Sequence, residues 1–515
     1  MRTTVKAAVL VARAVTVASV LVLGGAVPCF AAAAGGGGGE GGTVGTDYEC
    51  ERASGDVARD EMVIGFGSCN KPDFPQTAWQ WMDDTDLFLF NGDVVYSATI
   101  GVDGLEKAFD SLDAGPAYQR VKQAKASKWH CRAVADNCEV HQGIWSTWDD
   151  HDFGINDGGG GEPLPIIKDL QVEERLRVFK EHMHPRCTDT SRVTLSSRNG
   201  TYHSTKLHVG DKRDVVISLL DTRTHRQLHA IPSLGTFSFI PLIGKLFPIT
   251  AGATRMLAAN LGWGNTNRGA MLGEEQWRWL ENTLCSNNDD DTTHIIVSSI
   301  QVLTSNPLVE SWGHFPTELQ RLLSLLDTCN LKHAIIVSGD VHFTEFTSLP
   351  SGQLVEVTSS GMTHDCTGGV LPRALCSLAI STFGHHRSKQ DTFHPRRAFA
   401  KMRLHWRRDG AGGDTDTAQA EGNARATRDA DGGGGARGPS AVVEVIASED
   451  GQVVHTRRVV SLASGRVYGN EANQQRWGVI HRPPVPLHML MVSVAAVVLA
   501  AALPLLAWCC KRKSH

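Results

Sequence analysis

The sequence has no excess of charge of one sign. It holds 50 Lys and Arg residues against 55 Asp and Glu residues in a chain of 515, which gives a net charge of −5. Proteins that bind nucleic acid usually present a basic patch, so this balance gives no reason to expect a nucleic-acid-binding module. Long apolar runs are missing from the middle of the chain and occur only near its two ends. The middle is therefore expected to be an ordinary globular body.

The first apolar run has the features of a secretory signal. Arg2 and Lys6 precede the apolar residues 7–27, and small residues follow. This order predicts a cleaved signal peptide over residues 1–34, with an uncleaved anchor as the alternative. The glycine-rich residues after it predict a flexible linker over residues 35–59.

The second apolar run, residues 489–508, is long enough for a helix to cross the hydrocarbon core of a bilayer, which takes roughly 20 residues. A basic cap follows at residues 511–513, and basic residues favour the cytosolic side. We therefore expect a stalk over residues 466–487, a transmembrane helix over residues 488–509 and a cytosolic tail over residues 510–515.

This arrangement predicts a single-pass type I membrane protein of the secretory pathway, with its globular domain lumenal or extracellular and the membrane as a partner of the C-terminal helix. A lipid-anchor signal is the alternative, but its apolar tail normally ends without a basic cap. Lys511 and Lys513 fit a di-lysine retrieval pattern of the endoplasmic reticulum, although any stop-transfer segment can carry such lysines.

An even set of cysteines predicts disulfides in an oxidising compartment. Apart from Cys69 and the cysteines near the ends, the set is Cys50, Cys131, Cys138, Cys187, Cys285, Cys329, Cys366 and Cys376. Cys131 with Cys138 and Cys366 with Cys376 are local candidates, but the spacing leaves the pairing open. Asn199-Gly200-Thr201 is a glycosylation sequon, so the protein is expected to be a glycoprotein.

Short apolar runs that end in polar residues recur through the body and predict buried strands. They lie at residues 62–66, 87–90, 215–220, 295–297 and 334–337. Amphipathic helical patterns lie at residues 172–183, 274–284 and 317–326. This alternation predicts an α/β fold, in which ligands bind at the carboxyl ends of strands.

The main domain is expected over residues 60–407. Residues 408–438 are rich in Gly, Ala, Asp and Arg, with almost no large apolar side chains, and predict a disordered insertion. Two strand patterns around a turn then predict a terminal β-hairpin within residues 439–465. The apolar residues 237–249, which prolines interrupt, predict an insertion packed on the domain; a lid that touches a lipid-like substrate is the alternative.

Three carboxylates and a histidine crowd into the stretch Asp149-Asp150-His151-Asp152, directly after Trp148. A buried charge costs several kcal/mol unless it is paired or bound to a metal, so this stretch does not suit an ordinary core. If it is buried, it needs cations around it.

Other strand ends supply partners for this stretch: Cys69, Asp93 with Tyr96, and Asp340 with His342. Carboxylates and imidazoles bind divalent and trivalent metals, and one shared aspartate can bridge two ions. Taken singly, each motif has a simpler explanation as a turn, a core cysteine or a surface charge. Their conjunction at successive strand ends favours a polynuclear metal site.

At these positions the chain resembles the PhoD-like alkaline phosphatase and phosphodiesterase family of metallophosphatases. The matching stretches span roughly residues 60–366 and occur in the order of the family: residues 66–70, 91–96, 147–154 with Asn156, 220–226, 272–280, 310–316, 338–342 and 359–364. The resemblance implies a four-layer metallophosphoesterase sandwich, with two mixed β-sheets flanked by helices. It also implies a centre of divalent and trivalent metal ions, with iron and calcium the expected pair.

The resemblance also implies a role for individual side chains. The implied metal ligands are Cys69, Asp93, Tyr96, Asp150, Asn156, Asp340 and His342. His151 would contact phosphate or give a proton to the leaving group, and Arg223 would orient the phosphate. His364 is a further catalytic candidate near the site, whereas Asp149 and Asp152 would support the site from outside the metal shell.

The predicted function is a metal-dependent phosphoester hydrolase of the alkaline phosphatase or phosphodiesterase type, in which a metal-bound hydroxide attacks phosphorus in line. The substrate is expected to be a phosphoester; a lipid-like one is an alternative that the membrane anchor and the apolar residues 237–249 would suit. A catalytically inactive membrane-tethered scaffold or receptor with the same fold is one alternative. A phospholipase-type enzyme is another.

Overall fold

The structure is a computed structural model that describes residues 45–53, 61–97, 101–160, 171–188, 198–210, 213–229, 251–256, 269–304, 306–349, 354–366, 380, 393–406 and 440–459. The expected signal peptide, apolar stretch 237–249, insertion 408–438 and transmembrane helix lie outside these residues. Within them, no helix is both long and apolar enough to span a bilayer.

The larger sheet has nine strands in the order β11-β12-β10-β9-β8-β7-β1-β4-β5. In chain order its strands are β1 (Tyr48–Arg52), β4 (Trp129–Ala133), β5 (Cys138–Val140), β7 (His203–Gly210), β8 (Arg213–Leu219), β9 (Thr293–Val297), β10 (His333–Ser338), β11 (Thr344–Ser348) and β12 (Val355–Ser359). Neighbours β8, β9, β10 and β12 run parallel, whereas β7 with β8 and β11 with β12 are antiparallel, so the sheet is mixed.

The smaller sheet has six strands in the order β15-β14-β13-β2-β3-β6. Its strands are β2 (Glu61–Gly67), β3 (Leu87–Asn91), β6 (Ile144–Thr147), β13 (Ala398–His405), β14 (Ser440–Ala447) and β15 (Val453–Val459). Strands β2, β3 and β6 run parallel, and the other pairs are antiparallel. The hairpin expected near the end of the domain is therefore formed by β14 and β15.

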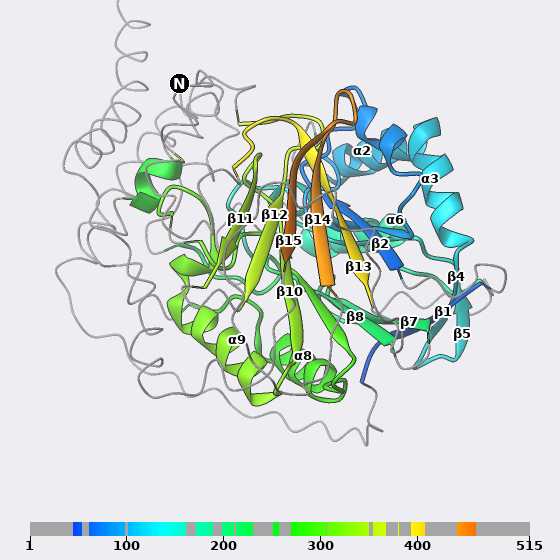
Figure 1. The fold of residues 1–515 in the computed structure, drawn as a ribbon. Coiled ribbons are helices and arrows are strands. Elements are labelled where there is room, and N and C mark those ends of the chain that lie inside the picture. The colour runs from blue at the N-terminus through cyan, green and yellow to red at the C-terminus, as the bar shows by residue number, and fades with distance from the viewer. Residues whose placement is uncertain are drawn as a thin grey trace, which may run out of the picture. The chain divides into compact units, whose positions relative to one another are not determined.

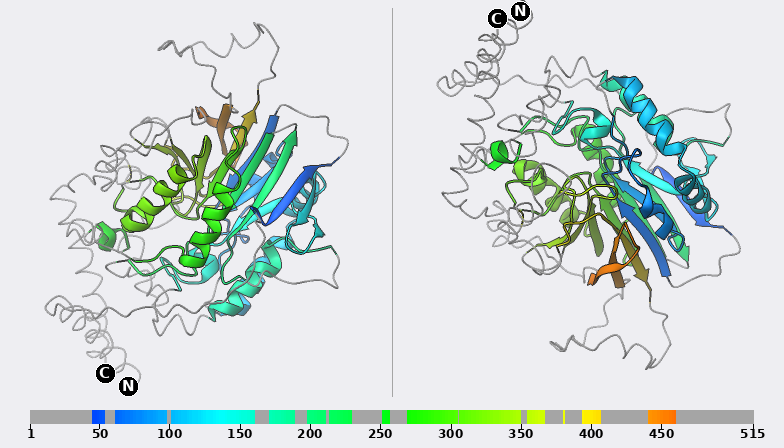
Figure 2. Two further views of the ribbon diagram at one scale, coloured as in Figure 1. Left: turned by 90° about the horizontal axis from the view of Figure 1, so that it is seen from below. Right: turned by 90° about the horizontal axis from the view of Figure 1, so that it is seen from above.

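Helices cover the outer faces of the two sheets. They are α2 (Val102–Asp113), α3 (Pro116–Ala126), α4 (Asp150–Phe153), α6 (Val172–Met183), α8 (Glu274–Cys285) and α9 (Pro316–Thr328), with 3-10 turns η1 (Thr77–Trp81) and η5 (Trp312–His314). Figure 1 shows α8 and α9 beside the larger sheet and α2, α3 and α6 beside the smaller one, and Figure 2 shows the strands between these two groups of helices.

Three apolar cores connect these layers. One core joins the facing sides of the two sheets, with Phe66 and Leu89 from the smaller sheet and Ile217 and Ile295 from the larger. A second core packs α2, α3 and α6 on the smaller sheet, and a third packs α8 and α9 on the larger. The α/β prediction is therefore confirmed, and the described elements lie in helix, sheet, sheet and helix layers.

The predicted strands and helices all form, but the sheet begins earlier than expected. Residues 48–52, which we assigned to a linker, form β1 between β4 and β7. Tyr48 and Cys50 pack on the core between the sheets, whereas Glu49 and Glu51 alternate with them on the polar side. A five-residue strand with charged alternate positions lacks the continuous apolar run by which we recognised the other strands.

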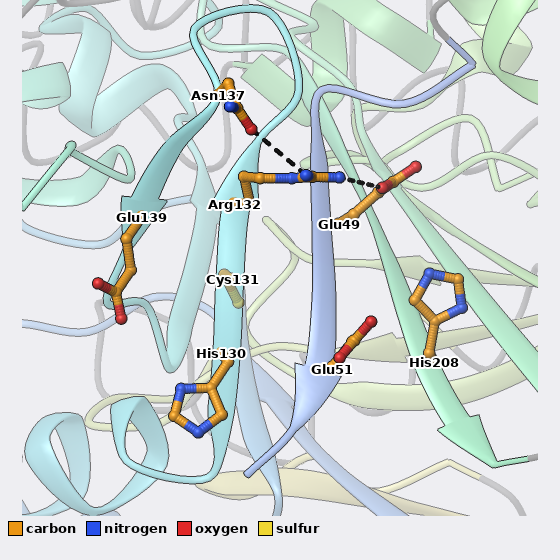
Figure 3. A pocket seen from close by; sticks show the side chains of 8 residues that line it. All are labelled: Glu49, Glu51, His130, Cys131, Arg132, Asn137, Glu139 and His208. Carbon is orange, nitrogen blue, oxygen red and sulfur yellow. Dashed lines mark hydrogen bonds and ion pairs between the residues drawn. The ribbon is translucent and has the colours of Figure 1, made fainter.

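The polar side of β1 borders a hollow of about 470 Å³ that is separate from the predicted site residues. Figure 3 shows its lining side chains on β1, β4, β5, β7 and the turn between β4 and β5, with Arg132 hydrogen-bonded to Asn137 and to Glu49. These are solvated pairs on an open sheet face, and such pairs contribute little to stability.

Three disulfides join described cysteines: Cys50–Cys131, Cys138–Cys187 and Cys285–Cys329. The local pairing of Cys131 with Cys138 was wrong. Cys131 on β4 lies directly opposite Cys50 on β1, and in the β4–β5 pair Cys138 lies opposite Ala133 instead. Cys366 is also disulfide-bonded, and its expected partner Cys376 lies outside the described residues.

The Cys285–Cys329 disulfide joins the C-terminal ends of α8 and α9 and closes a loop of 44 residues. Loop-closure entropy for that length predicts a contribution of about 4 kcal/mol to the free energy of unfolding. We expect the double variant Cys285→Ser/Cys329→Ser to show a lower urea midpoint with an unchanged far-ultraviolet circular dichroism spectrum. An unchanged midpoint would contradict the prediction.

Candidate metal centre

The predicted site residues meet where parallel strands of both sheets end. Cys69 follows β2, Asp93 follows β3 and Asp150 follows β6, all at one edge of the smaller sheet. Arg223 follows β8 and Asp340 follows β10 in the parallel part of the larger sheet. The two edges face one another: Asn91 Nδ2, at the end of β3, donates to the carbonyls of Ser338 and Ser359 at the ends of β10 and β12.

The backbone is strained at four of the predicted ligands. Cys69, Asp93, Asp340 and His342 have φ angles of 59°, 47°, 73° and 59°, in the left-handed region that L residues seldom occupy. Such conformations cost on the order of 1–3 kcal/mol each and occur preferentially at functional sites. Each of these residues lies in a tight turn, and the turn directs its side chain toward the other candidate ligands.

Gly92 and Gly339 allow the strand ends to approach each other. A Cβ atom on Gly92 would lie 2.7 Å from the Asp149 Cβ, and one on Gly339 would lie 2.3 Å from the Asn91 carbonyl oxygen. These two glycines therefore allow the loops at the strand ends to pack against one another.

The first potential ligand group consists of Cys69, Asp93 and His342, whose ligand atoms lie within 4.8 Å of one another. Cys69 Sγ lies 3.6 Å from Asp93 Oδ2. Tyr96 joins this group, because its hydroxyl donates to Asp93 Oδ2 at 2.6 Å and lies 3.1 Å from His342 Nε2. Thiol, phenol, imidazole and carboxylate together form a donor set for a transition metal.

A second group continues from the same aspartate. Asp93, Asp150 and His151 have ligand atoms within 4.8 Å of one another, and the backbone N–H of His151 donates to Asp93 Oδ1 at 3.2 Å. The His151 ring stacks on the Tyr96 ring with centroids 4.1 Å apart. Asp93 is thus shared between two adjacent groups, as a bridging ligand would be.

A third group contains carboxylates alone: Asp149, Asp150 and Asp340. Asp149 Oδ2 and Asp150 Oδ1 are buried and have no hydrogen-bond partner in the part of the chain that the structure describes. Oxygen-only sites bind hard cations such as calcium or magnesium. The two unpartnered oxygens and this donor set fit a bound cation, because a buried charged oxygen without a partner is otherwise costly.

Asp149 therefore belongs among the candidate ligands, whereas we expected it to support the site from outside the metal shell. Asp152 has the supporting role that we expected, since its carboxylate accepts the backbone N–H groups of Val94, Val95 and Asp149. It ties the loop after β3 to the loop after β6, and so fixes Asp93 relative to Asp150.

Asp150, Asp157 and Glu310 form a fourth group. Asp157 donates its backbone N–H to Asp150 Oδ2 at 2.7 Å, and its carboxylate accepts from Arg255 at 2.7 Å. Asp157 and Glu310 were also missed as site residues. Their loops follow no clear strand-end pattern, although Glu310 begins one of the stretches that carry the family resemblance.

Arg223 is fully buried and binds carboxylates of the protein itself. Its Nε donates to Asp149 Oδ1, and its two terminal nitrogens donate to Glu310 at 3.3 and 2.8 Å. Arg226 forms a second ion pair with Glu310. Arg223 thus holds Glu310 beside Asp149, and its predicted contact with phosphate stays a prediction.

Burial and mutual repulsion shape the acid–base behaviour of the cluster in the absence of metal. Burial, together with the charges of Cys69 and Asp150, raises the pKa of Asp93 well above its ordinary value. Burial raises the pKa of Asp149 to about 7 in spite of its ion pair with Arg223. Each carboxylate therefore favours a positive charge nearby, whether a proton or a metal ion.

The basic groups show the opposite response. Burial lowers the pKa of His151 and that of His342 to about 4, so both imidazoles are neutral near pH 7 and have a lone pair available.

Although burial acts to raise it, the pKa of Glu310 is held well below its ordinary value by Arg223 and Arg226. Negative charge at Glu310 is already compensated by protein cations.

His364 packs its ring against two members of the first group, with centroids 4.8 Å from Tyr96 and 4.4 Å from His342. Asn156 is half-buried on the loop between α4 and Asp157, and its role as a ligand stays a prediction. The structure therefore brings together Cys69, Asp93, Tyr96, Asp150, His151, Asp340, His342 and His364, with Arg223 behind them.

Comparison with known proteins identifies the family. The sequence profile of the PhoD-like phosphatase family matches residues 68–392. Alkaline phosphatase D of Bacillus subtilis (strain 168) is 31% identical over 88 residues, which are 15% of this chain and 14% of that protein. The match thus spans about one seventh of the length of that curated relative.

Solved structures of low sequence identity resemble this one. The structure of PhoD matches with a TM-score of 0.47 and 14% identity, over 85% of this chain and 77% of the other. A dimetal phosphatase from Danio rerio matches with a TM-score of 0.36 and 11% identity, over 78% of this chain and 98% of the other. The family profile alone covers more than half of the chain and includes every predicted site residue, so the chain belongs to the PhoD-like phosphatase family.

Proposed function

We propose that the protein is a metal-dependent phosphoester hydrolase that acts by in-line attack of water on phosphorus. The observation that carries the proposal is the pair of adjacent, chemically unlike ligand groups that meet at Asp93 and Asp150. The group with Cys69, Tyr96 and His342 suits an iron-type ion, and the carboxylate group suits a calcium-type ion. When bound, such a pair activates water and stabilises charge on the phosphate oxygens.

The side chains of the protein would position the metal ions, bind the phosphate and transfer the proton to the leaving group. Asp93 and Asp150 would set the spacing of the ions, because Asp152 and Asp157 fix the loops that hold them. His151, with a pKa of about 4 before substrate binds, would contact a phosphate oxygen and transfer a proton to the leaving oxygen once the added negative charge raises that pKa. Arg223 would affect phosphate binding indirectly, because its Nε donates to Asp149 and so holds that candidate ligand in place.

We further propose that the protein is a membrane-anchored glycoprotein of the secretory pathway, with its enzymatic domain lumenal or extracellular. The disulfides support an oxidising compartment. Asn199 of the sequon is exposed, which suits a glycan, and the apolar residues 489–508 would supply the anchor. A lipid-like phosphoester is the substrate that an anchored enzyme would reach most readily.

The alternative of an inactive scaffold has less support. A protein that had lost turnover would have no need to retain unpartnered buried oxygens on Asp149 and Asp150, which cost folding free energy without a cation. Metal content and hydrolysis of an aryl phosphodiester distinguish the two functions.

Asp93→Asn should abolish turnover without unfolding the protein. The amide keeps the size of the side chain but removes the charge shared by two ligand groups, and loss of several kcal/mol of transition-state stabilisation lowers kcat at least about a thousandfold. Hydrolysis of an aryl phosphodiester and metal content per chain measure the effect. The matched control is Asp136→Asn, a change at an exposed aspartate in the turn between β4 and β5, which should retain activity. Near wild-type turnover in Asp93→Asn would eliminate this site.

Chelation of the metals should destabilise the protein more at pH 8 than at pH 5. Burial raises the pKa of Asp149 and of Asp152 to about 7 without metal, against about 4 for an unfolded chain. The folded metal-free state then binds more protons than the unfolded state between these values, so its stability falls as the pH rises from about 4 to 7. Bound cations replace those protons and offset the fall.

Thermal melts with and without EDTA, at both pH values, measure this difference. The melting temperature lost on chelation should be small at pH 5 and several degrees larger at pH 8. An equal loss at the two pH values would contradict this account of the cluster.

A further inference from the structure

The loop after Cys69 forms one rim of the metal centre and is held in place by hydrogen bonds. The Lys71 backbone N–H donates to Thr363 Oγ1 at 2.8 Å, beside His364. Gln76 Nε2 donates to the Lys71 carbonyl at 2.8 Å, and Trp79 Nε1 donates to Gln76 Oε1 at 2.9 Å. The loop is therefore fixed relative to the strand ends that carry the ligand groups.

Lys71 brings a positive charge to this rim. Its Nζ lies 4.8 Å from the centroid of the Tyr96 ring and 5.3 Å from the centroid of the Phe74 ring. Within the described part of the chain, its Nζ has no carboxylate or carbonyl partner. The described guanidinium groups near the cluster are paired with carboxylates: Arg223 and Arg226 bind Glu310, and Arg255 binds Asp157. Lys71 is thus a cation available to an anionic ligand at the metal centre.

Phe74 brings an exposed apolar surface to the same rim. Its side chain is 44% exposed, and among the described residues only Val453, in the terminal hairpin, is also a large exposed apolar side chain. The His364 ring lies 6.2 Å from the Phe74 ring and in turn contacts the rings of Tyr96 and His342. A row of rings therefore leads from a candidate metal ligand to the surface and ends at Phe74.

We propose that Lys71 and Phe74 form a substrate subsite for phosphoesters with a planar, apolar leaving group. The Lys71 ammonium binds a non-bridging phosphate oxygen, and the Phe74 ring packs against an aryl or similarly planar group. This inference rests on the proposed function and assigns the same centre an aryl leaving group in place of a lipid-like one. Lys71 already lies over aromatic rings, so a ring on the leaving group would extend these cation–aromatic and edge-to-face contacts.

The test compares aryl and short alkyl esters in the metal-loaded protein. Phe74→Ala should raise KM for phenyl phosphate about threefold to tenfold, the range that one aromatic contact supplies, with kcat and the kinetics of methyl phosphate unchanged. Phe74→Tyr should retain the preference for the aryl ester. Val453→Ala, the matched loss of an exposed apolar side chain away from the rim, should leave both esters unaffected. An equal loss on both esters in Phe74→Ala, or no loss, would overturn the role of Phe74.

Lys71 is tested by the affinity for inorganic phosphate. Lys71→Met keeps the length of the side chain without its charge and should raise the inhibition constant of phosphate about tenfold, and Lys71→Arg should restore most of the affinity. An unchanged inhibition constant in Lys71→Met would overturn the role of Lys71.

Calorimetric titration separates the subsite from the proposed activity. Phenylphosphonate should bind the metal-loaded protein more tightly than methylphosphonate, and Phe74→Ala should remove the difference. If the wild-type protein binds both phosphonates with this preference but hydrolyses neither ester, the proposed function fails and the subsite stands. If it hydrolyses both esters but binds the two phosphonates equally, the subsite fails and the function stands.

Discussion

Buried negative charge at one point is the constraint on which the rest of the structure depends. Six carboxylates form the ligand groups: Asp93, Asp149, Asp150, Asp157, Asp340 and Glu310. All but Asp340 are almost fully buried. Their Coulomb repulsion in a medium of low dielectric constant would oppose folding if nothing offset it. The protein must therefore supply cations, protons or metal ions at this point.

The charge is offset unevenly across the cluster. Three arginines bind Glu310, Asp149 and Asp157, so one side of the cluster is compensated by the protein itself. Asp93, Asp150 and Asp340 have no arginine or lysine partner among the described residues. The uncompensated carboxylates are the three that the strand-end motifs predict as ligands, and the uneven balance therefore indicates where the metal ions would bind.

This arrangement needs both sheets. The parallel strands of the smaller sheet bring Cys69, Asp93 and Asp150 to one edge, and those of the larger sheet bring Asp340 to the facing edge. The core between the sheets, which Phe66 and Ile217 help to form, holds the two edges in register. Apolar burial there offsets the strained backbone conformations at the ligands.

The same geometry explains how much could be predicted from the sequence. A buried parallel strand and the residue after it are contiguous, so an apolar run followed by Asp93 or Asp340 marks both the element and the ligand. Asp157 and Glu310 lie in loops whose position depends on tertiary packing, and no local pattern distinguishes them. The predicted pairing of Cys131 with Cys138 was wrong for a similar reason. The register of β1 against β4 places Cys50 opposite Cys131, and the spacing of cysteines along the chain does not determine that register.

Arg223 shows how tertiary structure redirects a residue that the sequence identifies. Its guanidinium group already binds Asp149 and both oxygens of Glu310, so a phosphate contact that displaced these carboxylates would cost about 3–5 kcal/mol for a broken buried pair. Substrate charge would then be met on the open side of the cluster, where the ions would lie and where Lys71 has no anionic partner among the described residues. Because the Lys71 ammonium lies over the rings of Tyr96 and Phe74, the cation that meets the phosphate also determines which leaving groups fit beside it.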